Sequence, residues 1–193
     1  MNEKKYKDFT QKMEQSYPKM FARGYGGIGV GEGWWKILEN LCFQIQQHVS
    51  WKREQRAQDL VFNRRLKRAI EARSIAPFVE AYKRNIGQEP SKWTIDNYKE
   101  ALATEEFREV TEEIPQVRIR QIKEKFGGLR FYYDGGDEFI HGLVRMAESW
   151  ASTVCEQCGE PGMLRHGGWV QTLCDKHEAE RQEEYRKRYG DNE

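Results

Sequence analysis

The chain has 193 residues, of which 38% are hydrophobic, 33% charged and 12% aromatic, and its formal net charge is +1. A near-neutral charge argues against a dedicated non-specific duplex binder, which would carry a strongly basic surface. No apolar run approaches the roughly 20 residues of a membrane span, and no apolar signal-peptide segment follows the first residues, so we expect a cytoplasmic protein without membrane contact.

The first predicted region covers residues 1–51. A polar helix over residues 3–16 should end at Tyr17-Pro18, because the residue before a proline disfavours helix. Six glycines in the ten positions 24–33 exclude regular helix and allow close backbone approach. The loop lacks a Walker lysine and a GxGxxG run after a strand, so it is not assigned as a phosphate loop. We favour a loop that is closely packed against the core.

A helix is predicted from Trp34 to about Lys52, because apolar residues recur there at helical spacing. His48 lies on the apolar face, and we favour a core histidine with a satisfied hydrogen bond over a metal ligand. Cys42 is expected to be a small core residue. The apolar positions are Trp34, Leu38, Leu41, Ile45 and Val49.

The second region, residues 52–114, has the character of an inserted helical subdomain. Residues 52–73 hold eight basic side chains against three acidic ones and predict a basic helix. Shorter helices are predicted over 77–85, 93–103 and 105–111, with a turn before Pro90. The basic face could contact phosphates or an acidic protein, although a run of charge is more often a solvated face.

The third region, residues 115–154, predicts a β hairpin followed by a helix. Apolar and polar residues alternate from Val117, and Gly127-Gly128 is a typical hairpin turn between two strands. Asp137 is a suitable N-cap for a helix over 138–153. Together with the other regions, this hairpin predicts an α+β fold in which a small antiparallel sheet is packed by helices.

The fourth region, residues 155–193, carries a metal-binding pattern. Cys155 and Cys158 form one half-site, and Cys174 and His177 form a second half-site fifteen residues later. Three thiolates and one imidazole complete a tetrahedral zinc site, and four protein ligands make that site structural. A knuckle at Cys158-Gly159, a hairpin over 163–171 turning at Gly167-Gly168, and a polar terminal helix correspond to a treble clef. Two disulfides are the less favoured alternative.

Six short motifs stand out along the chain: Gly31-Glu-Gly-Trp34-Trp35, Lys123-Glu-Lys-Phe-Gly-Gly-Leu-Arg-Phe-Tyr-Tyr133, Ala147-Glu148-Ser149, Cys155-Glu-Gln-Cys-Gly159, Gly168-Trp169 and Thr172-Leu-Cys174. Together they resemble a widespread group of uncharacterised proteins encoded by tailed phages and prophages. The resemblance covers about residues 17–51 and 115–178 and leaves the basic insert out. It implies an accessory or host-interaction protein in the host cell cytosol, a class in which counter-defence proteins are frequent.

The predicted hairpin also interleaves cations with aromatic rings, a combination that suits a nucleotide or a single strand. Alternatively, the rings are core and the charges are the solvated outer face. Trp34, Trp35 and Arg23 could complete a pocket wall if the glycine-rich loop folds over the hairpin. The hairpin residues proposed to bind ligand are Lys123, Lys125, Phe126, Arg130 and Tyr132.

Three functions are compatible with these patterns. The favoured one is stoichiometric binding, either of a nucleotide-type signal or of a host defence protein. The second is a nucleic-acid-binding zinc finger that uses the basic insert. The third is a small nucleotide hydrolase using Asp134, Asp137 or His141, for which no catalytic motif is present. An exposed aromatic surface would favour a dimer.

Overall fold

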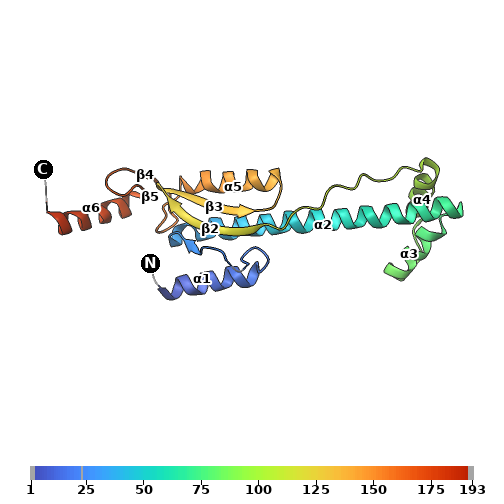
Figure 1. Ribbon diagram of the computed structural model, residues 1–193, viewed down its shortest axis with the longest axis horizontal. Coiled ribbons are helices and arrows are strands. Elements are labelled where there is room, and N and C mark those ends of the chain that lie inside the picture. Colours follow the sequence, from blue (N-terminus) through green and yellow to red (C-terminus); the bar gives the residue numbers. More distant parts are fainter. Residues whose placement is uncertain (1–2, 23, 191–193) are drawn as a thin grey trace. The chain divides into compact units, whose positions relative to one another are not determined.

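The computed structural model describes residues 3–22 and 24–190 and confirms the α+β fold (Figure 1). The chain divides into two compact units. The first, called the core unit here, comprises Met1–Val49 and Ile114–Glu193, and the second, the helical unit, comprises Ser50–Glu113. Among the described helices, none combines the length and apolarity that crossing a membrane requires.

Two helices build the N-terminal part of the core unit. Helix α1 (Glu3–Ser16) buries Phe9, whose ring stacks on Trp35 with 4.5 Å between centroids. A single turn, η1 (Glu32–Trp34), leads into α2, which runs from Trp35 to Ala72. The predicted break near residue 52 is therefore wrong. Neither glycine nor proline interrupts residues 35–72, so the change from apolar to basic composition does not end the helix.

A three-stranded sheet lies at the centre of the core unit. Strand β2 (Arg118–Lys125) pairs antiparallel with β3 (Gly128–Asp134) and parallel with the short β1 (Ile28–Gly29). The turn is formed by Phe126 and Gly127, both at positive φ (54° and 76°), one residue earlier than predicted. Two successive residues at positive φ match the twist that a two-residue hairpin requires, but a bulky residue such as Phe126 is strained there.

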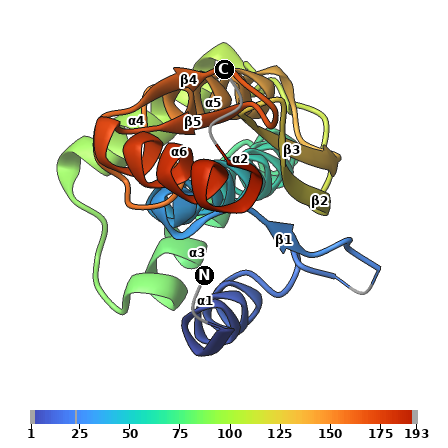
Figure 2. The ribbon, with the colours of Figure 1, turned by 90° about the vertical axis from the view of Figure 1, so that its left-hand side faces the viewer.

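Helices cover one face of this sheet. Helix α5 (Glu138–Ala151) begins after the N-cap Asp137, whose Oδ1 accepts a hydrogen bond from the backbone N–H of Ile140. Its buried side packs with α2 against the sheet, and the opposite face of β2 and β3 is left uncovered by the described helices of the core unit (Figure 2). The predicted ligand residues Lys123, Arg130 and Tyr132 lie on this uncovered face.

The C-terminal part of the core unit forms a small module. Strands β4 (Met163–Arg165) and β5 (Gln171–Leu173) pair antiparallel, and α6 (Asp175–Tyr189) follows directly. The connection is a five-residue loop over 166–170 rather than the predicted tight turn at Gly167-Gly168. Both glycines have positive φ within this loop. The predicted order of knuckle, hairpin and helix is present.

The helical unit has its own small core. Buried Leu66 and Ala69 of α2 pack with Phe78 of α3 (Ala76–Ile86), and the Phe78 ring stacks on Tyr98 of α4 (Lys92–Thr104) at 4.8 Å. The helix predicted over 105–111 is absent, because Glu105 adopts a left-handed conformation (φ 51°) that ends α4.

An extended segment follows α4 in the helical unit. The side chain of Asn63 forms two hydrogen bonds of 2.8 Å with the backbone of Arg108, one to its carbonyl and one from its N–H. The guanidinium of Arg108 pairs with Asp59 at 3.2 Å and lies 4.0 Å from the centre of the Phe62 ring. This segment is therefore held by side-chain contacts instead of helical backbone hydrogen bonds.

Candidate metal centre and ligand surface

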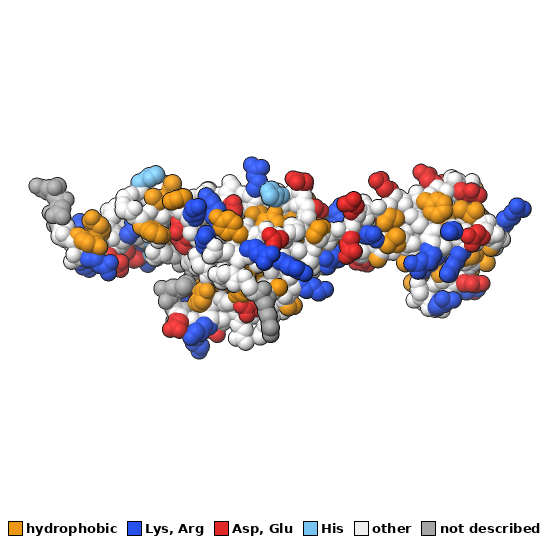
Figure 3. Space-filling model, viewed as in Figure 1, with side chains coloured by type: hydrophobic (Ala, Val, Ile, Leu, Met, Phe, Trp, Pro, Cys, Tyr) orange, Lys and Arg blue, Asp and Glu red, His pale blue; other side chains and the backbone are white. Residues whose placement is uncertain are grey.

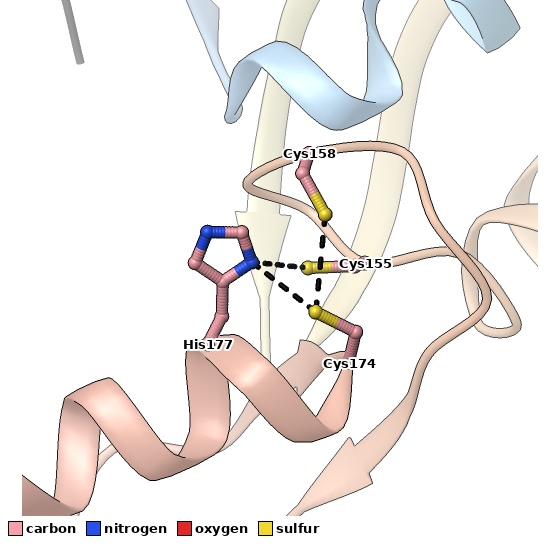
Figure 4. Close-up of side chains that lie close together, drawn as sticks. All are labelled: Cys155, Cys158, Cys174 and His177. Atoms are coloured by element: carbon pink, nitrogen blue, oxygen red, sulfur yellow. Dashed lines mark hydrogen bonds between the residues drawn. The ribbon is translucent and has the colours of Figure 1, made fainter.

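Four side chains from two elements converge at one end of the core unit (Figure 4). Cys155 and Cys158 lie on the knuckle, which we define as residues 155–159, directly after α5. Cys174 is the N-cap of α6, and His177 lies on the first turn of that helix. One ligand atom from each residue lies within 4.8 Å of every other, so the four residues lie close enough to bind one metal ion.

Three distances within the cluster are close to those of tetrahedral coordination. Nδ1 of His177 is 3.4 Å from Sγ of Cys155 and 3.2 Å from Sγ of Cys174, and the sulfurs of Cys158 and Cys174 are 3.8 Å apart. Zinc bonds of about 2.3 Å to sulfur and about 2.0 Å to nitrogen would place two sulfurs about 3.8 Å apart and a sulfur and a nitrogen about 3.5 Å apart. All four cysteines of the chain are free thiols, so the disulfide alternative is wrong.

The local electrostatics favour a thiolate at one of these positions. The backbone N–H of His177, at the start of α6, lowers the pKa of the Cys174 thiol to about 7. Desolvation and the neighbouring thiols raise the pKa of Cys158 to about 11. A bound divalent cation would favour the thiolate form at all three cysteines, because the metal binds the deprotonated sulfur.

The knuckle rests on the end of the glycine-rich loop. The N–H of Gly33 donates to the carbonyl of Glu156 over 2.8 Å, and the N–H of Gly31 donates to Oε1 of the same residue over 3.0 Å. Burial raises the pKa of Glu156, while the hydrogen bond from Gly31 acts in the opposite direction. The glycine-rich loop is thus a close-packed support, as favoured from the sequence.

Only glycine fits where this loop meets the knuckle. A Cβ atom at Gly33 would lie 2.1 Å from the carbonyl oxygen of Cys155 and 2.4 Å from the backbone nitrogen of Gly159. Next to it, Nε1 of the fully buried Trp34 donates to the carbonyl of Val154 over 2.8 Å. The backbone of the metal site and that of residues 31–34 therefore interlock.

The tip of the β2–β3 hairpin packs on the opposite side of the module. Oγ1 of the buried Thr172 donates to the carbonyl of Gly127 over 2.6 Å. A Cβ atom at Gly127 would lie 2.3 Å from Cδ1 of Leu164, so a larger residue would displace that side chain, and the positive φ of 76° would strain it as well. Phe126, the other turn residue, points into solvent and is 76% exposed. The C-terminal module therefore fixes the backbone of the hairpin tip, while the Phe126 ring stays exposed to solvent.

Several of the predicted ligand residues do share the uncovered face of the sheet. Lys123 lies opposite Arg130, and Gln121 lies opposite Tyr132. The ammonium of Lys123 is 5.3 Å from the centre of the Tyr132 ring. We call Arg120, Gln121, Lys123, Arg130 and Tyr132 the hairpin face. Figure 3 shows basic side chains gathered over β2 and β3 with hydrophobic side chains between them.

A shallow depression of about 490 Å³ runs along the hairpin face. It is bordered by Gly24 and Gly26 of the glycine-rich loop together with Arg120, Lys123 and Tyr132. Sequence reasoning missed Arg120 and Gln121, whose positions depend on a register shift between Ile119 and Gln121 in β2. Irregularities of this kind redirect side chains and have no clear signal in a single sequence.

The remaining predicted pocket residues lie elsewhere. Trp34 is fully buried in the core and Trp35 packs on α1, so neither forms a wall of the hairpin face. Both were placed there on the assumption that the glycine-rich loop folds over the hairpin. Instead, its first residues border the hairpin face, and Gly31 and Gly33 dock under the knuckle. Arg23 lies outside the described residues. Lys125 is near the face but at the hairpin tip, with its ammonium 5.4 Å from the Phe126 ring.

The residues considered for hydrolysis have structural partners. Asp134 pairs with Arg120 across the hairpin. Asp137 caps α5, and its Oδ2 is 2.8 Å from Nε2 of His48. His141 is 3.0 Å from the hydroxyl of Tyr133 through Nδ1. The contact with Asp137 makes His48 the core histidine that the sequence favoured.

Comparison of the chain with family models, with curated proteins and with solved structures finds no match. The two features that bear on function are therefore the cluster of three cysteines with His177 and the hairpin face.

Proposed function

We propose that this is a stoichiometric binding protein that is stabilised by a structural zinc ion and takes a nucleotide-type ligand on its hairpin face. The observation that carries the proposal is the placement of Lys123, Arg130 and Tyr132 on one uncovered sheet face. Cations next to an accessible ring can bind phosphate and stack a base at the same time.

The zinc part of the proposal rests on the donor set. Three thiolates and one imidazole gathered within 4.8 Å of one another are a donor set typical of zinc. Cys155, Cys158, Cys174 and His177 would fill all four positions and leave none for water or substrate. A zinc ion there would supply folding free energy, and the protein's own residues would then position the hairpin tip through Thr172 and Leu164.

The charge balance on the hairpin face supports an anionic ligand. Asp134 is already paired with Arg120, and Oε1 of Glu124 accepts a hydrogen bond from the N–H of Gly127 over 2.5 Å. No described carboxylate lies within ion-pair distance of Lys123 or Arg130. Nη1 of Arg130 donates to the carbonyl of Leu129 over 2.7 Å, which leaves its other guanidinium N–H groups and the ammonium of Lys123 for a phosphate group.

The biological role that fits this binding is counter-defence in the host cell cytosol. The resemblance of several motifs to tailed-phage proteins supports it, since such a protein could sequester a nucleotide signal of the host or dock on a host defence protein. The helical unit is less favoured as a nucleic-acid surface, because residues 50–113 hold 13 Lys and Arg against 12 Asp and Glu. Hydrolysis is less favoured because its candidate residues have structural partners.

Fluorescence anisotropy with labelled adenine nucleotides and with a short oligothymidylate tests this function. Arg130→Ala and Tyr132→Ala should each weaken binding about tenfold, since a stacked base alone is worth about 1–3 kcal/mol. Lys36→Ala is the matched control, because Lys36 is an exposed lysine of the core unit on α2. Wild-type affinity of both hairpin variants for every probe would show that the hairpin face is only scaffold.

A further inference from the structure

A second exposed aromatic residue, Trp169, lies on the β4–β5 loop of the C-terminal module. The Trp169 ring is 70% exposed, yet its backbone is fixed. Nη1 of Arg181 donates to the carbonyl of Trp169 over 2.7 Å, and Nη2 donates to the carbonyl of His166 over 3.3 Å. Glu178 in turn holds Arg181 through a 2.9 Å hydrogen bond. Helix α6 thus fixes the backbone of the 166–170 loop, while the Trp169 ring faces solvent. An exposed ring on a fixed backbone is suited to contact a ligand.

This loop and α6 border a groove that, like the hairpin face, carries rings and cations, and that is also lined by Glu178 and Glu184. The groove has a volume of about 1310 Å³. Tyr185 and Tyr189 lie on its α6 side, with 4.8 Å between ring centroids, and both are more than half exposed. Arg186 and Arg188 also border it, and no described carboxylate lies within ion-pair distance of either. Rings for stacking and cations for phosphate again occur together.

The hairpin tip joins the two surfaces. A Cβ atom added at Gly127 would meet Leu164 and Val170, so the hairpin tip with the exposed Phe126 lies next to the module that carries Trp169. Phe126 also keeps a left-handed backbone conformation that costs a bulky residue on the order of 1 kcal/mol. The hairpin turn thus holds this exposed ring at a defined position at the tip.

We propose that the groove between residues 166–169 and α6 is a second stacking site, and that the ligand of the protein is single-stranded nucleic acid. The strand would run from the hairpin face over Phe126 to Trp169. This inference rests on the proposed function, since it extends the nucleotide site on the hairpin face, and it names the substrate class. Base stacking tolerates any sequence, so little sequence preference is expected.

The test compares a thymidine dinucleotide with a ten-nucleotide oligothymidylate by fluorescence anisotropy on the full chain. The longer probe should bind wild-type protein more tightly. Trp169→Ala should reduce its affinity about tenfold, the loss of one stacked base, and leave the dinucleotide affinity unchanged. Trp93→Ala is the matched control, since Trp93 is 75% exposed in the helical unit and should alter neither affinity.

The outcomes separate this inference from the function on which it rests. Equal affinity for both probes, or no effect of Trp169→Ala on the longer one, would overturn the second site while leaving the hairpin site in place. Failure of wild-type protein to bind any nucleotide probe would overturn both. Circular dichroism and zinc content of Trp169→Ala should match wild type, because the exposed ring contributes little to folding.

Discussion

The core unit and the helical unit hold their folds together by different means. In the core unit, the knuckle that carries Cys155 and Cys158 packs on residues 31–34 through direct backbone contacts, and there is no space for a side chain at Gly33. In the helical unit, a few apolar side chains around Phe78 form the core, and side chains such as Asn63 hold the extended segment. The core unit also has a much larger cluster of buried apolar residues than the helical unit.

The difference shows where each unit is vulnerable. A metal ion that joins two elements contributes folding free energy only while all its ligands are present, so the core unit should respond sharply to metal loss. A small apolar cluster loses stability in proportion to the atoms removed and the cavity left, and should not respond to chelators. Variants of a metal ligand, of the Phe78 cluster and of Gly33 should therefore differ in their effect on stability and on zinc content.

The largest effect should come from a ligand of the metal. Cys158→Ser is expected to unfold the C-terminal module, with a loss on the order of 5 kcal/mol or more, because structural zinc supplies folding free energy directly. Thermal melting followed by circular dichroism, with zinc content measured on the purified protein, tests this. Cys42→Ala is the control, since Cys42 is a buried thiol of α2 outside the cluster. An unchanged melt of Cys158→Ser would remove the zinc claim.

A smaller effect is expected in the helical unit. Phe78→Ala should destabilise that unit by about 4 kcal/mol, because it deletes the largest side chain of its core and breaks the stack on Tyr98. The zinc content should stay at the wild-type value. Limited proteolysis, read by mass spectrometry, should find the new cleavage sites within 50–113. Loss of zinc in this variant would contradict the independence of the two units.

The third variant tests the backbone contact under the knuckle. Gly33→Ala should cost about 3 kcal/mol, because the added methyl group overlaps the carbonyl of Cys155 and the backbone of Gly159. Gly142→Ala is the control, for which we expect an increase in the free energy of unfolding instead of a decrease. Gly142 lies in α5 with open space around it, so alanine there should stabilise the helix by about 0.5–1 kcal/mol. Denaturant titration distinguishes the two, and equal midpoints would show that the interlock is dispensable.

Local patterns of the sequence predicted much of the fold. Helical spacing identified α5, alternation identified β2 and β3, and the spacing of Cys155, Cys158, Cys174 and His177 identified the cluster that the structure assembles. These features depend on neighbouring residues or on fixed ligand chemistry. The continuity of α2 was missed because its apolar stripe narrows after residue 50, although no residue interrupts the helix.

Long-range contacts could not be predicted in the same way. Trp34 was placed on a ligand surface because an aromatic residue beside glycines fits either a pocket or a core, and only its bond to Val154, 120 positions away, distinguishes the two. The role of Arg181 in fixing Trp169 also depends on packing between two elements. The turn lies at Phe126-Gly127, one residue earlier than predicted, and the carbonyl of Gly127 there accepts a hydrogen bond from Thr172, 45 positions away.

Hydrogen exchange on the intact protein, before and after removal of metal with a chelator, tests the central claim most directly. We expect the amides of residues 155–177 and those of residues 31–34 to lose protection together, because the knuckle and the loop share backbone contacts. The amides of residues 50–113 should keep theirs. Unchanged protection in residues 155–177 and 31–34 after chelation would show that no metal supports this end of the protein. Loss confined to residues 155–177 would show that the interlock with Gly31 and Gly33 does not exist.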